Sequence, residues 1–244
     1  MRLAAALAVL LAWLVSVEQS RAQDRPTRPN VWDIHIGAAA AAIPDGFVNY
    51  TCGTGGGPPS LPLANFAAFR KCRPDANRLH EVYFEYDDEL EYWARALDLK
   101  PEIRMYAGTT AYEFPVVASV LFDEAGLVKG LRLVTDPRQH LSRDRSEFWA
   151  LGTFIRQRFG DDGWNCTEAA ADEGERPVGS LFVKNHCEKT ANGLHLILEQ
   201  RYFRKKGQRL VDPDTGQLRS EDFESSTRFE KYDAGLRLRQ SGGN

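Results

Sequence analysis

The chain has 244 residues, of which 43% are hydrophobic and 27% charged, and its formal net charge is −3 at pH 7. This hydrophobic content suffices for one large core or two smaller ones, and it excludes disorder over most of the chain. The slightly acidic balance excludes a general electrostatic attraction to nucleic acid, so no nucleic-acid partner is expected.

The first 22 residues have the pattern of a secretory signal peptide. Arg2 precedes an apolar run that reaches Val17, and Ser20 and Ala22 are small residues at the two positions that signal peptidase reads. The run of about 15 residues is short of the roughly 20 that span a bilayer, which argues against the alternative of an uncleaved anchor. We expect cleavage after Ala22, a flexible leader at residues 23–30 and no transmembrane segment in the mature chain.

The next elements are expected from hydrophobic alternation and helical spacing. They are a strand at 31–36, a short strand at 47–50, a short amphipathic helix at 61–71, a half-buried strand at 80–86 and a hairpin at 115–136 with its turn at 123–126.

A glycine-rich stretch, residues 53–60, follows the second of these strands. Exposed glycine N–H groups before a helix can bind phosphate. However, the last glycine is followed by Pro58 and Pro59, which donate no N–H, and the lysine of a phosphate loop is missing. We therefore favour a tight turn that leads to Ser60 as a helix N-cap, with phosphate binding as the alternative.

Four carboxylates, Asp87, Asp88, Glu89 and Glu91, directly follow the strand that begins at His80. Such a cluster could supply an acid/base pair, with His80 nearby on the strand. The structural interpretation is that acidic residues in the first turn of a helix complement its dipole. We favour the structural interpretation and keep these five residues as the candidate catalytic set.

Parts of residues 91–134 are echoed further along the chain. The first copy reads Glu91-Tyr92-Trp93-Ala94, Pro115-Val116 and Gly130-Leu131, and the second reads Glu147-Phe148-Trp149-Ala150, Pro177-Val178 and Gly193-Leu194. Each copy is typical of an aromatic helix followed by a two-stranded hairpin, which indicates a diverged internal repeat. The second copy predicts a helix at 142–157, whose aromatic stripe is interpreted as a core face.

The pattern predicts an α+β fold of two tandem lobes, each a helix on an antiparallel sheet, which could share one continuous sheet. The first lobe is expected at 31–140, with extra N-terminal strands, and the second at 141–235. A disordered tail is expected at 236–244.

The only notable basic cluster comprises Arg201, Arg204, Lys205, Lys206 and Arg209. It is expected at the tip of a hairpin, where charge commonly serves solubility. It is also the candidate binding site for an anionic surface or polymer.

The four cysteines fall into two pairs, each about twenty residues apart, and an oxidising compartment favours the local pairings Cys52–Cys72 and Cys166–Cys187. Each disulfide would contribute on the order of 3 kcal/mol in the chain-entropy model. The rival interpretation is a zinc site, but the chain has no CxxC and its histidines are scattered, so we expect no metal and no cofactor. Arginine is far more frequent than lysine, as in GC-rich bacteria, which favours the periplasm over extracellular secretion.

Three functions remain open. The favoured one is a non-catalytic envelope protein that binds a protein partner or an envelope component, because no nucleophile–base–orienter motif is present. The first alternative is a carboxylate-dependent hydrolase or carbohydrate-acting enzyme that uses Asp87, Asp88, Glu89 or Glu91. The second is a weak anionic-surface binder that uses the basic cluster. The sequence does not define the oligomeric state.

Overall fold

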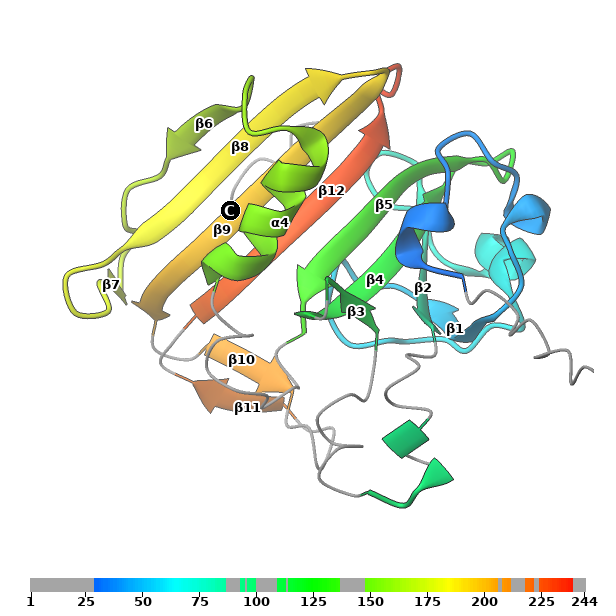
Figure 1. Cartoon of the computed structure of the whole chain (residues 1–244), viewed down its shortest axis with the longest axis horizontal. Helices are drawn as coiled ribbons and strands as arrows, with labels where there is room; N and C mark the ends of the chain where they lie inside the picture. Colours follow the sequence, from blue (N-terminus) through cyan, green and yellow to red (C-terminus); the bar gives the residue numbers. More distant parts are fainter. Residues whose placement is uncertain are drawn as a thin grey trace, which may run out of the picture.

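The computed structural model describes residues 29–86, 93–94, 96–99, 109–112, 114–136, 148–205, 208–211, 218–221 and 224–238. These residues form one large antiparallel sheet of ten strands and a separate two-stranded sheet (Figure 1). The signal peptide and most of the leader expected at residues 1–30 lie outside this part of the chain.

Eight strands form the path of the large sheet, in the order β1-β2-β4-β5-β12-β9-β8-β6. Their bounds are β1 Phe47–Cys52, β2 His80–Tyr86, β4 Phe114–Phe122, β5 Val128–Thr135, β12 Glu224–Asp233, β9 Leu194–Lys205, β8 Val183–Ala191 and β6 Asn165–Glu168. Two short strands join the path from outside: β3 (Thr110–Ala111) pairs with β4, and β7 (Glu175–Arg176) pairs with β9. The separate sheet consists of β10 (Gln208–Val211) and β11 (Leu218–Glu221).

The expected fold of two helix-on-sheet lobes is wrong. Strands account for 46% of the structure and helices for 16%, and α4 (Phe148–Phe159) is the one helix of seven or more residues in the described part of the chain. The sheet continues from β5 directly into β12, whose residues 228–232 pair with residues 130–134. The expected boundary at residue 140 lies outside the described residues and stays a prediction.

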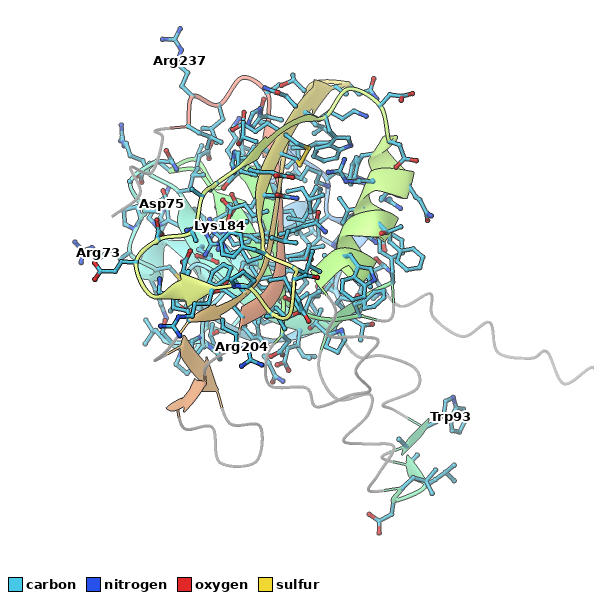
Figure 2. All side chains as sticks on the ribbon, turned by 90° about the vertical axis from the view of Figure 1, so that its left-hand side faces the viewer. Arg73, Asp75, Trp93, Lys184, Arg204 and Arg237 are labelled. Carbon is cyan, nitrogen blue, oxygen red and sulfur yellow. A yellow bond between two sulfur atoms is a disulfide. The ribbon has the colours of Figure 1, made fainter. Side chains whose placement is uncertain are left out.

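The repeat in the sequence is not a repeat in space. Pro115 lies inside β4, whereas Pro177 lies in the loop before β8. Gly130 lies inside β5, whereas Gly193 has a φ of +73° in the turn before β9. The label of Trp93 in Figure 2 lies well apart from the sheet, while α4 crosses β9 and β12 in Figure 1. The two copies therefore occupy different structural positions.

Several local elements agree with the sequence patterns. The hairpin of β4 and β5 turns at Asp123, whose carboxylate accepts hydrogen bonds from the N–H groups of Ala125 and Leu127.

Two expectations in the N-terminal region are wrong. Residues 31–33 form a 3-10 helix, η1 (Val31–Asp33), because Asn30 caps it through the N–H of Trp32. The helix expected at 61–71 is the shorter 3-10 helix η3 (Phe66–Lys71). A further 3-10 helix, η2 (Ala40–Ala42), lies between η1 and β1.

One face of the large sheet, here called the core face, carries the main hydrophobic core. Side chains alternate between the faces along each strand, and residues such as Phe84, Leu133 and Phe229 belong to one buried cluster with Leu151 and Ile155 of α4. The 3-10 helix η1 covers the same face, because the ring of Trp32 lies 6.4 Å from that of Phe229 and 6.2 Å from that of Phe159 at the end of α4. The opposite face, here called the polar face, carries the other set of strand residues.

Both expected disulfides are confirmed: Cys52 pairs with Cys72, and Cys166 pairs with Cys187. The first joins the end of β1 to the residue that ends η3. The second joins residues that lie directly opposite each other on β6 and β8.

Candidate functional site

Polar side chains form a row across the polar face. Ser119 lies opposite Tyr83 of β2 and opposite Arg132 of β5, and Arg132 lies opposite Glu230 of β12. Opposite residues of antiparallel strands point to the same face with Cβ atoms about 5 Å apart, so these four side chains are neighbours. Long-range strand pairing builds the row, because Arg132 and Glu230 are 98 residues apart in the sequence.

Five of the side chains on this face form a buried ion network: Glu81, Arg132, Arg228, Glu230 and Tyr232. Arg132 is held by two carboxylates, with Nη1 2.7 Å from Glu81 Oε2 and Nε 2.6 Å from Glu230 Oε1. Arg228 Nη2 lies 2.6 Å from the same Glu230 oxygen, and the Tyr232 hydroxyl donates to the other Glu230 oxygen at 2.8 Å. Two arginines and two glutamates leave the network without net charge.

The pairing fixes the charge states of the network. Burial alone would lower the pKa of Arg132, but the carboxylates of Glu230 and Glu81 raise it above the ordinary value. Burial alone would likewise raise the pKa of Glu230, but Arg132 and Arg228 hold it below the ordinary value. Glu230 is therefore ionised at neutral pH and cannot serve as a general acid, which requires a raised pKa.

The glycine-rich stretch covers the network rather than delivering Ser60 to a helix. Gly55 N–H donates to Glu81 Oε2 at 2.8 Å, and Arg228 Nη1 donates to Gly55 O at 2.6 Å. A Cβ at Gly53 would lie 2.4 Å from Glu81 Cγ, and one at Gly56 would lie 2.5 Å from Val134 Cγ2. The glycines are needed because the backbone lies directly on the sheet. The expectation of Ser60 as an N-cap is wrong, since its hydroxyl donates to Cys52 O.

The candidate catalytic carboxylates Asp87, Asp88, Glu89 and Glu91 lie outside the described residues. His80 is buried at the start of β2, with Nδ1 2.6 Å from Cys72 O and Nε2 3.6 Å from Glu124 Oε2. The strand has seven residues, His80–Tyr86, so its ends are six residue steps, or about 20 Å, apart. His80 thus lies at the end of β2 opposite to the one that leads to those carboxylates, and the catalytic set stays a prediction.

The basic cluster is not the tip of a hairpin, because β9 continues through Lys205 and leads towards β10. Arg201 and Lys205 are on the polar face, where Arg201 lies 3.4 Å from Glu199 and Lys205 lies 3.3 Å from Glu175. Arg204 points to the other face by strand alternation and is exposed at the lower end of β9 (Figure 2). Lys206 and the side chain of Arg209 lie outside the described part, so an anion site there stays a prediction.

A second polar group, missed by the sequence analysis, lies on the outer half of the polar face. His186 of β8 is held between Glu188, 2.8 Å from Nε2, and Glu199, 3.3 Å from Nδ1. Burial would lower the pKa of His186, but hydrogen bonds to the two carboxylates raise it. The signal was present in the sequence as charged residues at alternating positions of adjacent strands, but only the register shows that they meet.

The hydrophobic residues of α4 divide between the core and the surface. Leu151 and Ile155 are fully buried, whereas Trp149 and Phe154 are 42% and 39% exposed. The expectation that Trp149 belongs to a core stripe is therefore wrong. The ring of Phe154 stacks on Tyr112 at 5.3 Å and lies 5.6 Å from Phe114, so aromatic contacts continue from α4 to the residue that follows β3 and to β4.

Comparisons of the chain with protein-family models, with curated proteins and with solved structures find no match. In the described part of the chain, no helix is both long and apolar enough to cross a membrane. Nor do the described residues include a group of three or more His, Cys, Asp or Glu side chains placed to hold a metal ion.

Proposed function

We propose that the protein is an exported, non-catalytic envelope protein that binds a protein partner, with the periplasm as its compartment. The two disulfides support export, because such bonds persist in oxidising compartments. The signal-peptide pattern of residues 1–22 supports it independently.

The exposed aromatic surface around α4 carries the proposal. Trp149 and Phe154 are five residues apart on the helix and so leave it about 140° apart. Ala150 and Thr153 lie between them, so a strip of small side chains separates two large aromatic rings. Aromatic side chains are enriched at protein interfaces, and an exposed Trp and Phe on either side of small residues fit an apolar partner surface.

The chemistry of the polar face supports binding over catalysis. Each charged group of the buried ion network is neutralised by another member, so its ionised groups hold structure rather than react with a substrate. The enzymatic alternative would need the carboxylates at 87–91, and His80 lies at the end of β2 that is farther along the chain from them.

Site-specific photo-crosslinking in the native compartment tests the proposal. A photoreactive phenylalanine analogue at position 149 or 154 should give a defined adduct with one protein partner. The same analogue at Ala170, an exposed loop position, is the matched control and should not give that adduct. The proposal fails if positions 149 and 154 give no adduct, or if Ala170 gives the same one.

A further inference from the structure

The two disulfides have different surroundings. Cys52 and Cys72 are both buried, at 7% and 3% exposure, within the main core. Cys187 is 1% exposed, but its partner Cys166 is an exposed residue of β6. A thiolate from solution can therefore approach the second disulfide from the Cys166 side, and access is one of the factors that determine the rate of thiol–disulfide exchange.

A guanidinium group contacts both sulfurs of the second disulfide. Arg156 Nη2 of α4 lies 3.1 Å from Cys187 Sγ and 3.4 Å from Cys166 Sγ. The ring of Trp164, 5.3 Å from the Arg156 guanidinium carbon, supports that group from another side. Among the described residues, Arg156 has no carboxylate partner, so its charge is available to the sulfurs.

This arrangement favours cleavage of the bond. A nearby cation lowers the pKa of a thiol, and a thiol of lower pKa is a better leaving group in exchange. The closer sulfur to Arg156 is the buried one, Cys187 Sγ, and the more accessible residue is Cys166. The sulfur to be attacked and the sulfur to be released are thus distinguished by their surroundings.

We propose that Cys166–Cys187 is a thiol–disulfide exchange site for a protein dithiol. A thiolate of the dithiol attacks Cys166 Sγ, the Cys166–Cys187 bond breaks, and its electron pair stays on Cys187 Sγ as a thiolate beside Arg156. The second thiol of the dithiol loses its proton and attacks the first sulfur of the dithiol, the one that is bonded to Cys166 Sγ in the mixed disulfide. Cys166 leaves as a thiolate and takes up a proton, so the dithiol is oxidised and this protein gains two electrons.

Reduction has a structural consequence at the edge of the sheet. Among the described strands, β6 pairs only with β8, over four residue pairs, and all four of its residues are exposed. The disulfide is the covalent tie between the two strands. Its reduction frees β6 to separate from β8 and exposes the edge of β8. The unpaired backbone groups of an edge strand can pair with a strand of another chain. This inference does not depend on the proposed partner surface around α4.

The test is a timed reduction of the folded protein with dithiothreitol at pH 7.5, followed by alkylation of free thiols and peptide mass spectrometry. Cys166 and Cys187 should become alkylated at least about tenfold faster than Cys52 and Cys72, which serve as the internal control. Equal rates for the two disulfides, or faster reduction of Cys52–Cys72, would overturn the proposal.

Arg156→Met should slow reduction of Cys166–Cys187 by roughly threefold to tenfold, because the cation beside the leaving sulfur is lost. Arg158→Met is the matched control: it removes the same charge from the same helix, but Arg158 lies over Trp32 at 4.4 Å instead. An unchanged rate in Arg156→Met, or the same slowing in Arg158→Met, contradicts the role of Arg156. If both disulfides of Arg156→Met are reduced rapidly, that variant is unfolded, and the same experiment is done with Arg156→Lys. In Arg156→Lys, faster reduction of Cys166–Cys187 than of Cys52–Cys72 supports the proposal. Equal rates for its two disulfides contradict it.

Discussion

At the residue scale, the polar face depends on a few charged groups that neutralise one another. The side chains of Arg132, Glu81 and Glu230 are 8%, 11% and 10% exposed. Desolvation of such groups is costly, and the network offsets it through short contacts on both sides of Arg132. A single truncation therefore leaves charge buried without its partner.

We predict that Arg132→Met lowers the free energy of unfolding by about 3–5 kcal/mol, because it removes the cation that Glu81 contacts and leaves Glu230 with Arg228 alone. Lys129→Met on the same strand is the control. Lys129 pairs with Asp233 at 2.9 Å, but the two side chains are 24% and 33% exposed, so its loss should cost about 1 kcal/mol or less. Urea unfolding with the disulfides intact measures both variants, and equal costs would contradict the role of the network.

A buried cation on the core face gives a prediction about pH. Lys231 is 7% exposed and donates to Ile34 O at 3.4 Å. Burial, with a contribution from Arg158, lowers its pKa to about 8 from 10.5. Between these two values the unfolded chain binds a proton that the folded chain does not, so folding stability contributed by this group rises with pH.

Lys231→Met should therefore raise the free energy of unfolding at pH 7 by about 2 kcal/mol, and the gain should shrink as the pH rises from 8 to 10.5. The methionine fills similar space and carries no charge. Urea unfolding of both proteins across this pH range is the measurement. A variant that is less stable than the original protein at pH 7, or a stability difference between the two that does not change with pH, would show that the buried charge of Lys231 does not destabilise the fold.

At the element scale, the glycine-rich stretch acts as a cover for the polar face. Gly55 and Gly56 both have positive φ values, +77° and +91°. They differ in space, because a Cβ at Gly55 meets nothing within 4 Å, whereas one at Gly56 meets Val134 Cγ2 at 2.5 Å. This difference separates the need for glycine backbone from the need for close approach.

Gly55→Ala should cost about 1 kcal/mol of stability for the left-handed backbone alone. Gly56→Ala should cost about 1–3 kcal/mol more, because its Cβ pushes the stretch away from β5. Thermal unfolding compares the two variants. Similar costs at both positions would mean that the stretch does not lie against the sheet.

The sequence predicted those elements whose signals are local. Alternation identified β2, the turn residues at Asp123 identified the hairpin of β4 and β5, and spacing identified both disulfides. The helix α4 was expected too, but the sequence could not show which aromatic residues of the helix face outward. Burial of Leu151 and exposure of Trp149 depend on how the helix lies over β9 and β12.

At the scale of the whole molecule, long-range pairing decides the architecture and carries no local signal. β12 lies between β5 and β9, so the last strand joins the two parts of the chain into one sheet. The ion network follows from this register, because it brings Glu230 beside Arg132. The apparent repeat was misleading since its shared residues, such as Gly130 and Gly193, serve a strand in one copy and a turn in the other.

The whole molecule thus presents a polar face whose buried charges are paired with one another, and an apolar surface around α4. We propose partner binding for the second of these. The variants that separate them must leave the core unchanged, so they replace exposed side chains only. Trp149→Ala with Phe154→Ala removes the aromatic rings, and Glu188→Gln with Thr190→Ala alters exposed groups on the polar face.

The most direct measurement is the affinity of both double variants for the partner captured by crosslinking at position 149 or 154. We predict that the aromatic variant binds at least about tenfold more weakly than the original protein, because exposed aromatic anchors carry much of the energy of an interface. The polar-face variant should bind within about twofold of it, as expected for residues outside an interface. Unchanged binding by the aromatic variant, or a loss confined to the polar-face variant, would contradict the account.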